Sequence, residues 1–475
     1  MATRKIRIAQ FATVSIDDMV GRCIELILTP AVEILPYGFE RVEKKIPVPT
    51  KIKLYHKFVF LTHIIITKCV TAKDNKIQLH SKRLQNVLGI YYKYILYTLK
   101  LLDLIDIDEK YEKDEYSRHI SVLNWNISYT ESANQKVSEY NSKWEKYLND
   151  DIKRNSENKK IKVRFSEGRP ILEFDGKEIT QAEKTFYDNY NDSLSLLNLR
   201  VCKEDSIKYI ESLCEEKNTH EYNYYMHSIL GFSAENNKII SIDKQGRIYN
   251  YLTNLKRELK CLFNIKFQLD VANCHPLLIC KILTNRYNIN NDILTYIYNN
   301  IKKGASAHNV IENLCKTLNT SNIKIPLDVL EFIYICSKGT LWDELQASFP
   351  ELSRSRVKEQ TFGQIIYNSK IAELTHFGRR FIEIYPNVYD TISLYTGKLS
   401  LKIMKLESDI MRMILEECYL RNWKVINIHD AVVVLDVAEN EHVTPEELIG
   451  IIKDKFFRHY LFPAVHYEEP LLPCL

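Results

Sequence analysis

The chain has 475 residues, of which 45% are apolar and 27% charged, and this composition is typical of a globular protein rather than a disordered or fibrous one. Its length allows roughly two to four domains. The formal net charge of +4 permits nucleic-acid binding without arguing for it. The 11 cysteines form no Cys-x-x-Cys pair, which argues against a zinc site and a disulfide framework.

Neither a signal peptide nor a membrane span is predicted. The most apolar stretch, Lys57–Val70, is too short and too interrupted to cross a bilayer. We therefore expect a cytoplasmic protein with no membrane partner. Glycine and proline are scarce, at 13 each, and this scarcity favours a mostly helical α+β protein with few long loops.

After an N-terminal extension (residues 1–50), residues 51–130 have the pattern of a small DNA-binding domain. An apolar helix (56–70) precedes a short helix that Ser81 can cap, and Gly89 marks a turn. A further helix and two strands around a charged tip follow. This order is typical of a winged helix-turn-helix, whose groove-facing helix would carry Lys93 and Lys100. A small helical packing domain is the alternative.

The next two segments carry less information. Residues 131–160 are polar and charged, which indicates a solvated helix or linker. Residues 161–238 begin with a predicted hairpin and continue as helices, a thumb-like region if the rest is a polymerase. We place the last domain at residues 239–475, where strands and helices alternate.

Two strands of this last domain carry an aspartate. The strand that begins at Ile265 alternates apolar and polar residues and ends at Asp270, before a helix predicted near Pro276. The second is "INIHDAVVVLD" (Ile426–Asp436), where Asp430 interrupts an apolar run. An ionised carboxylate among apolar side chains needs a cation or a hydrogen-bond network. Two such aspartates fit a two-metal magnesium site.

A cationic helix is predicted between the two aspartates. In "SRSRVKEQTFGQIIYNSK" (Ser353–Lys370), residues Arg354, Lys358 and Phe362 are spaced four apart, so they share one helix face. That face offers two cations for a triphosphate and a ring on which a base can stack.

Together these segments resemble the family A DNA polymerases and the related single-subunit phage and mitochondrial RNA polymerases. The resemblance covers roughly the second half of the chain and includes the segments 244–260 and 380–392 that flank the motifs. The matching residues are Asp270 for motif A; Arg354, Lys358, Phe362 and Gly363 for motif B; and His429 with Asp430 for motif C. Motif C of the family is a hairpin, so the resemblance implies that "INIHDAVVVLD" is a strand-turn-strand with His429 and Asp430 at its tip. It also implies a last strand near Ala464–Glu469 that returns to the palm.

The resemblance implies a palm and fingers that add nucleotides to a nucleic-acid 3′ end in DNA replication, with no proofreading exonuclease. Asp270 and Asp430 would hold two Mg²⁺ ions, with Mn²⁺ as a substitute. Arg354 and Lys358 would grip the triphosphate, with Lys358 also donating a proton to pyrophosphate, and Phe362 would stack near the base.

The resemblance also implies contacts with the nucleic acid. His429 would contact the primer terminus or support the geometry of the turn, and a packed structural histidine is the alternative. Arg247 would contact the minor groove of the primer or template. The implied partners are a DNA primer-template or single-stranded nucleic acid and nucleoside triphosphates, while protein partners stay unknown. A winged helix beside a polymerase would suit a phage, plasmid or other mobile element.

Three positions depart from the family pattern. Ala431 replaces the glutamate that follows the motif C aspartate in the DNA enzymes. His275 stands where those enzymes have a glutamate that excludes the ribose 2′-hydroxyl. The motif B tyrosine position holds Ile366, and Tyr367, one residue later and about 100° around the helix, can serve only if the helix is locally distorted.

Two alternatives stay open. The same palm could belong to a primase, an RNA polymerase or a template-independent transferase. A non-catalytic DNA-binding initiator or regulator with a degenerate palm is the other alternative, although retention of both aspartates and the cationic helix argues against it.

Overall fold

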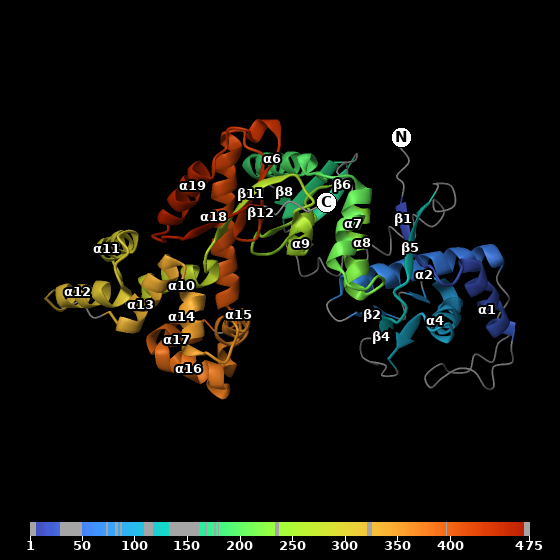
Figure 1. Cartoon of the computed structure of the whole chain (residues 1–475), viewed down its shortest axis with the longest axis horizontal. Helices are drawn as coiled ribbons and strands as arrows, with labels where there is room; N and C mark the ends of the chain where they lie inside the picture. Colours follow the sequence, from blue (N-terminus) through green and yellow to red (C-terminus); the bar gives the residue numbers. More distant parts are fainter. Residues whose placement is uncertain are drawn as a thin grey trace. The chain divides into compact units, whose positions relative to one another are not determined.

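A computed structural model describes most of the chain and shows a mostly helical α+β protein with small antiparallel sheets, which confirms the predicted class (Figure 1). The described residues are 6–28, 50–72, 75–80, 84–85, 88–108, 117–132, 161–166, 169–174, 177–178, 180–232, 237–320, 325–395 and 397–469. They form two compact units: the first contains the described residues of 1–158 and 201–232, and the second those of 159–200 and 233–472. None of the described helices has the length and apolar character needed to cross a membrane.

The first unit contains a three-stranded antiparallel sheet with two helices along its sequence. The order is α2 (Lys51–Thr71), β2 (Lys76–His80), η1 (Gly89–Tyr91), α4 (Tyr92–Leu101), β3 (Ile105–Ile107) and β4 (Ser117–Val122). In the sheet β4 lies between β2 and β3. Gly89 has a positive φ of 69°, so the predicted turn is present. The sequence analysis missed β2, and the predicted Ser81 cap and the charged strand tip lie outside the described residues.

Further elements complete this unit. They are β1 (Ile6–Phe11), paired with β5 (Ile127–Ser132), and the helices α1 (Ile16–Leu28), α7 (Lys203–Leu213) and α8 (His220–Gly231). One apolar cluster from α1, α2, α4 and the strands forms the core, with Phe58, Leu61 and Ile65 fully buried. On α8, Asn223 donates a hydrogen bond from Nδ2 to the carbonyl of Trp125 (2.8 Å). Trp125 lies between β4 and β5, so this bond connects α8 to the segment that joins these strands.

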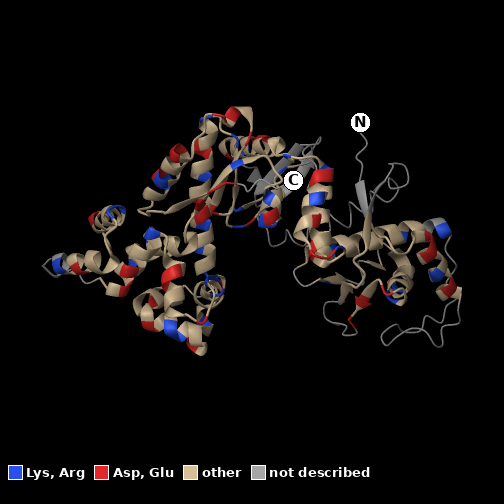
Figure 2. Ribbon diagram, viewed as in Figure 1, with Lys and Arg blue, Asp and Glu red and all other residues tan. Residues whose placement is uncertain are grey.

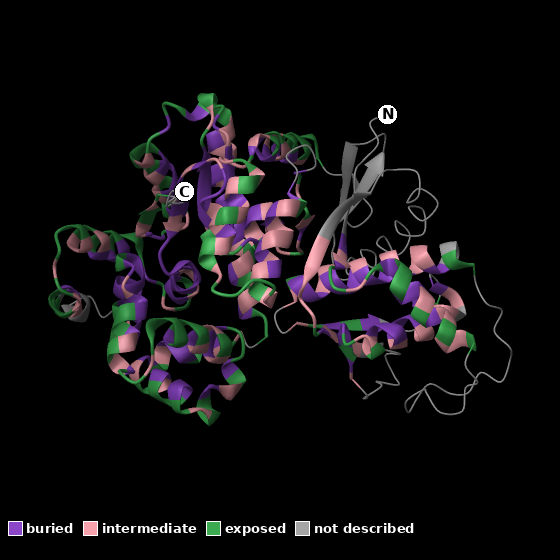
Figure 3. Ribbon diagram, turned by 45° about the vertical axis from the view of Figure 1, so that its right-hand side comes forward, coloured by how far each residue is buried: buried purple, intermediate pink, exposed green. Residues whose placement is uncertain are grey.

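The second unit is organised around a four-stranded antiparallel sheet of order β12-β13-β11-β14. Its strands are β11 (Ile265–Val271), β12 (Val425–Ile428), β13 (Ala431–Leu435) and β14 (Val465–Glu468). All residues of β12 and β13 are buried, while β11 alternates buried and half-buried residues, as its sequence predicts (Figure 3). The long helix α18 (Leu399–Leu420) packs on β12 and on α10 (Cys274–Arg286).

A helical region is inserted between α10 and α18 (yellow to orange in Figure 1). Its elements are α11 (Asn291–Lys302), α12 (Ala307–Thr320), α13 (Leu327–Lys338), α14 (Leu341–Ser348), α15 (Arg354–Gln360), η4 (Thr361–Ile366), η5 (Ser369–Leu374), α16 (His376–Ile384) and α17 (Pro386–Ser393). Gly378 allows a close approach in this region, because a Cβ there would lie 2.0 Å from the carbonyl oxygen of Ala372. This insertion is where the resemblance expects fingers.

The remaining elements frame the sheet. They are β6 (Ile161–Ser166), β7 (Arg169–Phe174), β8 (Lys177–Glu178), α6 (Gln181–Leu196), β9 (Ser241–Ile242), β10 (Ile248–Tyr249), η3 (Tyr251–Asn254), α9 (Arg257–Lys260), η6 (Ala438–Asn440) and α19 (Pro445–Phe457). The hairpin predicted after residue 161 is present as β6 and β7. Residues 161–238 are shared between the two units rather than forming one of their own. Acidic and basic residues are interspersed over the described helices (Figure 2).

Candidate active site

The His429–Asp430 pair forms the tip of a tight hairpin. Ile428 pairs with Ala431, so only these two residues turn the chain from β12 to β13, and His429 adopts a left-handed φ of 54°. Such a φ is uncommon for a residue with a Cβ, and it needs support from its surroundings. The buried strand first suggested by "INIHDAVVVLD" is therefore a strand-turn-strand, as the sequence analysis predicted.

A buried polar network holds the base of this hairpin. Asn427 donates from Nδ2 to the carbonyl of His429 (3.1 Å) and accepts at Oδ1 from the Tyr190 hydroxyl (3.0 Å). Asn250 donates to both the Tyr190 oxygen (2.7 Å) and the Asn427 carbonyl (2.8 Å). Both Tyr190, on α6, and Asn250, directly after β10, are fully buried. These two elements therefore support the turn between β12 and β13.

Asp270 and Asp430 lie side by side at this turn. In the β11–β13 ladder, Asp270 is opposite Ala431, the residue next to Asp430. On its other side β11 pairs with β14, where Asp270 is opposite His466. Two aspartates 160 positions apart in sequence are thus brought to one edge of the sheet.

Both aspartates open into a cavity of about 510 Å³, which we call the aspartate cleft. Its lining comes from the sheet, the start of α10, and helices α14, α15 and η4. The lining residues are Arg247, Arg257, Asp270, Val271, Ala272, Asn273, Cys274, His275, Gly339, Trp342, Arg354, Lys358, Phe362, His429, Asp430, His466 and Glu468. All the predicted site residues of the last domain are among them except Tyr367, which contacts His275.

Three carboxylates, those of Asp270, Asp430 and Glu468, line the aspartate cleft. Burial, together with the charges of Asp430 and Glu468, raises the pKa of Asp270 to about 7, although Lys358 opposes the shift. Burial also raises the pKa of Asp430, and the charge of Glu407 adds to this. Among the described residues, no three His, Cys, Asp or Glu side chains form a group that could hold a metal ion. The clustered carboxylates are therefore a place where a cation would be stabilised.

The residues of the predicted cationic face, Arg354, Lys358 and Phe362, line the same cleft. Arg354 donates from Nε to Asp343 (2.7 Å) in a pair whose side chains are both about half exposed. The Lys358 ammonium lies 5.9 Å from the centre of the Trp342 ring. Exposed ion pairs of this kind contribute little stability, so Arg354 can leave Asp343 for a stronger anion.

The helix distortion that Tyr367 requires is present. Residues Thr361–Ile366 form a π-helical segment, η4, and the Tyr367 N–H bonds to the Phe362 carbonyl five residues earlier (2.9 Å). The extra residue in this turn rotates Tyr367 back toward the cleft, where its ring lies 5.5 Å from Phe362. Its hydroxyl is 3.1 Å from Nδ1 of His275.

The sequence analysis missed Glu407, which links several of these groups. Glu407 is 1% exposed and lies on α18, from where it accepts two hydrogen bonds from Arg247 (2.6 and 2.8 Å). Nε2 of His275 is 2.8 Å from the same carboxylate. Although burial opposes it, these hydrogen bonds lower the pKa of Glu407. Arg247 is thus held by an ion pair, whereas the sequence analysis assigned it to the minor groove.

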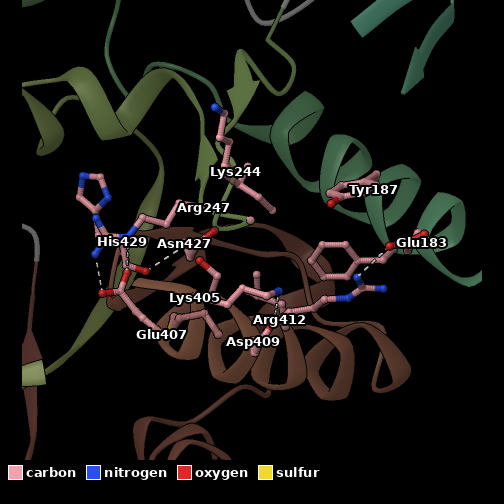
Figure 4. A pocket seen from close by; sticks show the side chains of 16 residues that line it. Glu183, Tyr187, Lys244, Arg247, Lys405, Glu407, Asp409, Arg412, Asn427 and His429 are labelled. Atoms are coloured by element: carbon pink, nitrogen blue, oxygen red, sulfur yellow. Dashed lines mark hydrogen bonds and ion pairs between the residues drawn. The ribbon is translucent and has the colours of Figure 1, made fainter. Parts of the chain in front are cut away.

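A second, smaller cavity of about 180 Å³ is lined in part by the Arg247–Glu407 ion pair. It shares Arg247 and His429 with the aspartate cleft. Figure 4 shows Glu407 reaching from α18 toward Arg247, beside His429 and Asn427. Most of the charged residues that line this second cavity already form ion pairs, for example Lys405 with Asp409 (2.6 Å). A pattern of apolar residues identifies α18 as a helix but gives no sign that Glu407 faces inward.

Other missed residues are Arg257, His466 and Glu468. Arg257 pairs with Glu468 (3.1 Å) at the rim of the aspartate cleft. Strand β14 was predicted without any role for its side chains, and only its pairing with β11 reveals their position.

The two candidates of the first unit are described separately. Lys93 and Lys100 lie on α4, as predicted. The Lys100 ammonium is 3.5 Å from Asp106 on β3, and both side chains are partly exposed. Nothing in their surroundings identifies a ligand.

No protein-family model, curated protein or solved structure matches this chain.

Proposed function

We propose that the protein is a nucleotidyltransferase that adds nucleotides to the 3′ end of a nucleic acid, with a palm and fingers of the family A DNA polymerase type. The observation that supports this most is the aspartate cleft itself. Asp270 on β11 and Asp430 in the turn before the neighbouring strand β13 line one cavity together with Arg354 and Lys358 of α15 and Phe362 of η4. Each element alone is common, but their convergence is what phosphoryl transfer from a triphosphate requires.

The donor set fits magnesium. Mg²⁺ takes one or two protein carboxylates and fills its other positions with waters and substrate phosphates. Asp270 and Asp430 supply two carboxylates. The nearby charges of Glu468 and Glu407 raise their pKa values, so a bound cation would reduce the repulsion among these carboxylates. When bound, two Mg²⁺ ions would lower the pKa of the attacking 3′-hydroxyl and stabilise the leaving pyrophosphate.

The chain's own cations would hold the substrate. Arg354 and Lys358 would bind the triphosphate, with Arg354 exchanging its exposed partner Asp343 for phosphate oxygens. Lys358 is within electrostatic reach of both aspartates, and it is the proton donor that the resemblance implies for pyrophosphate. Phe362, flanked by Trp342 at 5.6 Å, would offer its ring to the base.

His275 and Tyr367 would close the sugar side of the site. His275 occupies the position of the family's ribose-excluding glutamate, and the bond to the Tyr367 hydroxyl fixes the ring as a wall of the cleft. A bulky wall at this point disfavours an added 2′-hydroxyl, so we propose deoxynucleotides as the preferred substrates.

The first unit supports a nucleic-acid substrate through its topology. We propose that this unit is a winged helix, and the element order α2, β2, α4, β3, β4 with β4 central in the sheet supports the proposal. We propose that α4, with Lys93 and Lys100, faces nucleic acid. This part of the proposal rests on fold alone.

Primer extension on a defined template tests the proposal. The wild-type chain should add labelled deoxynucleotides with Mg²⁺, and Asp270→Asn and Asp430→Asn should each lower the rate about a thousandfold or more. Glu441→Gln, which changes an exposed carboxylate away from the cleft, is the matched control and should keep full activity.

The same assay separates the alternatives. Addition that follows the template base supports the polymerase, and addition indifferent to the template supports a terminal transferase. A preference for ribonucleotides or initiation without a primer supports an RNA polymerase or a primase. Full activity in either aspartate variant, or no incorporation by the wild type under any condition, would reject catalysis at this cleft.

A further inference from the structure

The turn after α19 holds an exposed tyrosine in an unusual backbone conformation. Tyr460 has a left-handed φ of 60°. Its N–H bonds to the Phe457 carbonyl (2.7 Å), and the next N–H, that of Leu461, bonds to the Phe456 carbonyl (3.1 Å). This pair of bonds is a common way to end a helix. The left-handed position within it is usually held by glycine, because a side chain there is strained.

Other helices that end in this way follow the preference. Helices α4, α11, α13 and α18 end in the same pair of bonds. Their left-handed residues are Asp103, Gly304, Gly339 and Asn422. Tyr460 is the exception among these five helix ends, and its ring is 39% exposed, so packing in a core does not account for it. Backbone strain that persists without a packing reason is found mainly at binding and active sites.

Tyr460 belongs to a surface of aromatic rings and lysines, which we call the aromatic patch. It consists of Phe457, Tyr460, Phe462, Tyr298, Lys281 and Lys302. The Phe457 ring is 50% exposed and lies 5.4 Å from the ring of Phe462. Phe462 is buried and stacks on Tyr298 of α11, with 4.4 Å between the ring centres. These contacts join the end of α19 and α11 into one surface.

Two lysines lie over rings of the aromatic patch. The Lys281 ammonium, on α10, is 4.9 Å from the centre of the Tyr460 ring. The Lys302 ammonium, on α11, is 4.4 Å from the centre of the Tyr298 ring. Neither ammonium forms an ion pair with a carboxylate in the part of the chain that the structure describes. The rings attract these charges without neutralising them, so an anion can still bind.

A ligand of the aromatic patch has to offer both flat rings and negative charge. Interfaces between proteins also use aromatic residues, but their buried centres are depleted of lysine. A single strand of nucleic acid meets both requirements, because its bases are free to stack and its phosphates are anionic. A duplex meets only the second, since its bases are enclosed in the stack.

We propose that the aromatic patch binds single-stranded nucleic acid, with bases stacked on Phe457 and Tyr460 and phosphates bound by Lys281 and Lys302. Lys281 is seven residues after Cys274, which lines the aspartate cleft, and this is about 10 Å along the axis of α10. The separation is short enough for one strand to contact both sites. Binding to the patch does not require catalysis at the aspartate cleft.

Fluorescence anisotropy with a labelled single-stranded deoxyoligonucleotide, on the full chain without Mg²⁺, measures this binding. Phe457→Ala and Tyr460→Gly each remove one ring and should weaken the affinity about 5- to 100-fold. Because glycine suits the left-handed backbone, the melting temperature of Tyr460→Gly should stay close to that of the wild type or rise. A loss of affinity without a loss of stability separates a binding role from a structural one.

The salt dependence tests the lysines separately. Lys281→Gln removes one phosphate contact and should reduce the slope of log affinity against log salt concentration by about 0.7. Lys316→Gln, at an exposed lysine on α12 that pairs with Glu312 (2.8 Å), is the matched control and should leave the slope unchanged.

Tyr296→Ala is the matched control for the ring variants. Tyr296 is 38% exposed on α11, but it lies two residues from Tyr298, about 200° around the helix, and so on its other side. This variant should keep an affinity within about twofold of wild type. A duplex of the same length should bind the wild type and the ring variants equally.

Wild-type affinity for the single strand in both ring variants would overturn the inference. An equal loss of affinity for the duplex would also overturn it, because stacking needs free bases. Self-association of the wild type that the ring variants abolish, with unchanged affinity for the strand, would assign the patch to a second copy of the chain instead.

Primer extension separates this inference from the proposed function. A chain that binds the strand through the aromatic patch but adds no nucleotide would support the inference and reject the proposed function. A chain that adds nucleotides while both ring variants bind like the wild type would reject the inference alone.

Discussion

Both units bury ionisable groups that burial keeps neutral, but the second unit also buries a carboxylate that stays charged. In the first unit burial lowers the pKa of His63 to about 4 and raises the pKa of the Cys69 thiol to about 12, so both groups are neutral near pH 7. In the second unit Glu407 is almost fully buried and yet its pKa is lowered, because Arg247 and His275 hold its charge. Neutral burial serves packing, whereas buried charge has to be compensated by partners or by a ligand.

The difference separates structural from functional polar groups in this chain. The His63 Nδ1 accepts a hydrogen bond from the Ala9 N–H (3.1 Å), which fastens β1 to α2. Around the aspartate cleft, Asn273 and His429 keep buried polar atoms without partners among the described residues. Of the six such side-chain atoms in the described part of the chain, three belong to these two residues, while Asn75 in the first unit contributes one. Buried polar atoms without partners beside a cavity are candidates for contact with a ligand.

The largest effect is expected from breaking the Glu407 ion pair. Glu407→Ala leaves the Arg247 guanidinium, 13% exposed, without its counter-charge, and should lower the free energy of unfolding by about 3 to 5 kcal/mol. Glu407→Gln keeps the shape and should cost less. Urea denaturation of the full chain, followed through the transition of the second unit, measures both.

An exposed pair on the same helix provides the control. Arg412 donates to Glu416 (2.8 Å), and both side chains are about a third to a half exposed. Glu416→Ala should change stability by less than about 1 kcal/mol. Equal losses for Glu407→Ala and Glu416→Ala would show that the buried pair is no more than a surface contact.

The neutral burial in the first unit predicts a pH dependence. The pKa of His63 is about 4 in the folded chain because of burial and the nearby charge of His227, against about 6.5 in the unfolded chain. Between these values the unfolded state binds more protons, so stability should fall as the pH drops from about 6.5 to 4, by about 3 kcal/mol at most.

The His63→Asn variant tests the source of this dependence. Asparagine keeps an acceptor for the Ala9 N–H but does not titrate, so the acid-induced loss in the first unit should be smaller than in the wild type. NMR titration of the His63 ring gives the pKa directly. A ring that titrates near 6.5 in the folded chain would contradict neutral burial.

Local sequence patterns were enough to predict the parts of the site that depend on neighbours along the chain. The alternation before Asp270 predicted β11, and the match of His429 and Asp430 to motif C predicted the hairpin. The mismatch at Tyr367 made a helix distortion the condition for a role of this tyrosine, and η4 is such a distortion. Each of these features depends on fewer than about twenty consecutive residues.

Features that arise from tertiary packing were not predictable. Glu407 is one acidic residue on an amphipathic helix, and only the approach of β10 and α10 turns it into a buried counter-ion. Asn273 has the sequence of an ordinary N-cap, and its left-handed backbone, which removes the cap bond, is not encoded in a local pattern. Strand β2 was missed because it pairs with β4, some 40 residues later.

The smallest effect is expected at Tyr367, where a substitution can remove a single hydrogen bond, that between its hydroxyl and His275. Burial raises the pKa of Tyr367, so its hydroxyl keeps its proton and can donate to Nδ1 of His275, while Nε2 of His275 contacts Arg247 (2.7 Å) and Glu407 (2.8 Å). Tyr367→Phe removes only the bond to Nδ1 and should cost about 1 kcal/mol or less. The ring then loses one of its three polar contacts, so discrimination against ribonucleotides should fall by no more than about tenfold, measured as the ratio of kcat/KM for deoxy- and ribonucleotides. Tyr296→Phe, at a similarly exposed tyrosine on α11, is the control and should leave the ratio unchanged. An unchanged ratio in Tyr367→Phe, with a His275 NMR spectrum that has shifted, would show that the hydroxyl orients the ring without guarding the sugar.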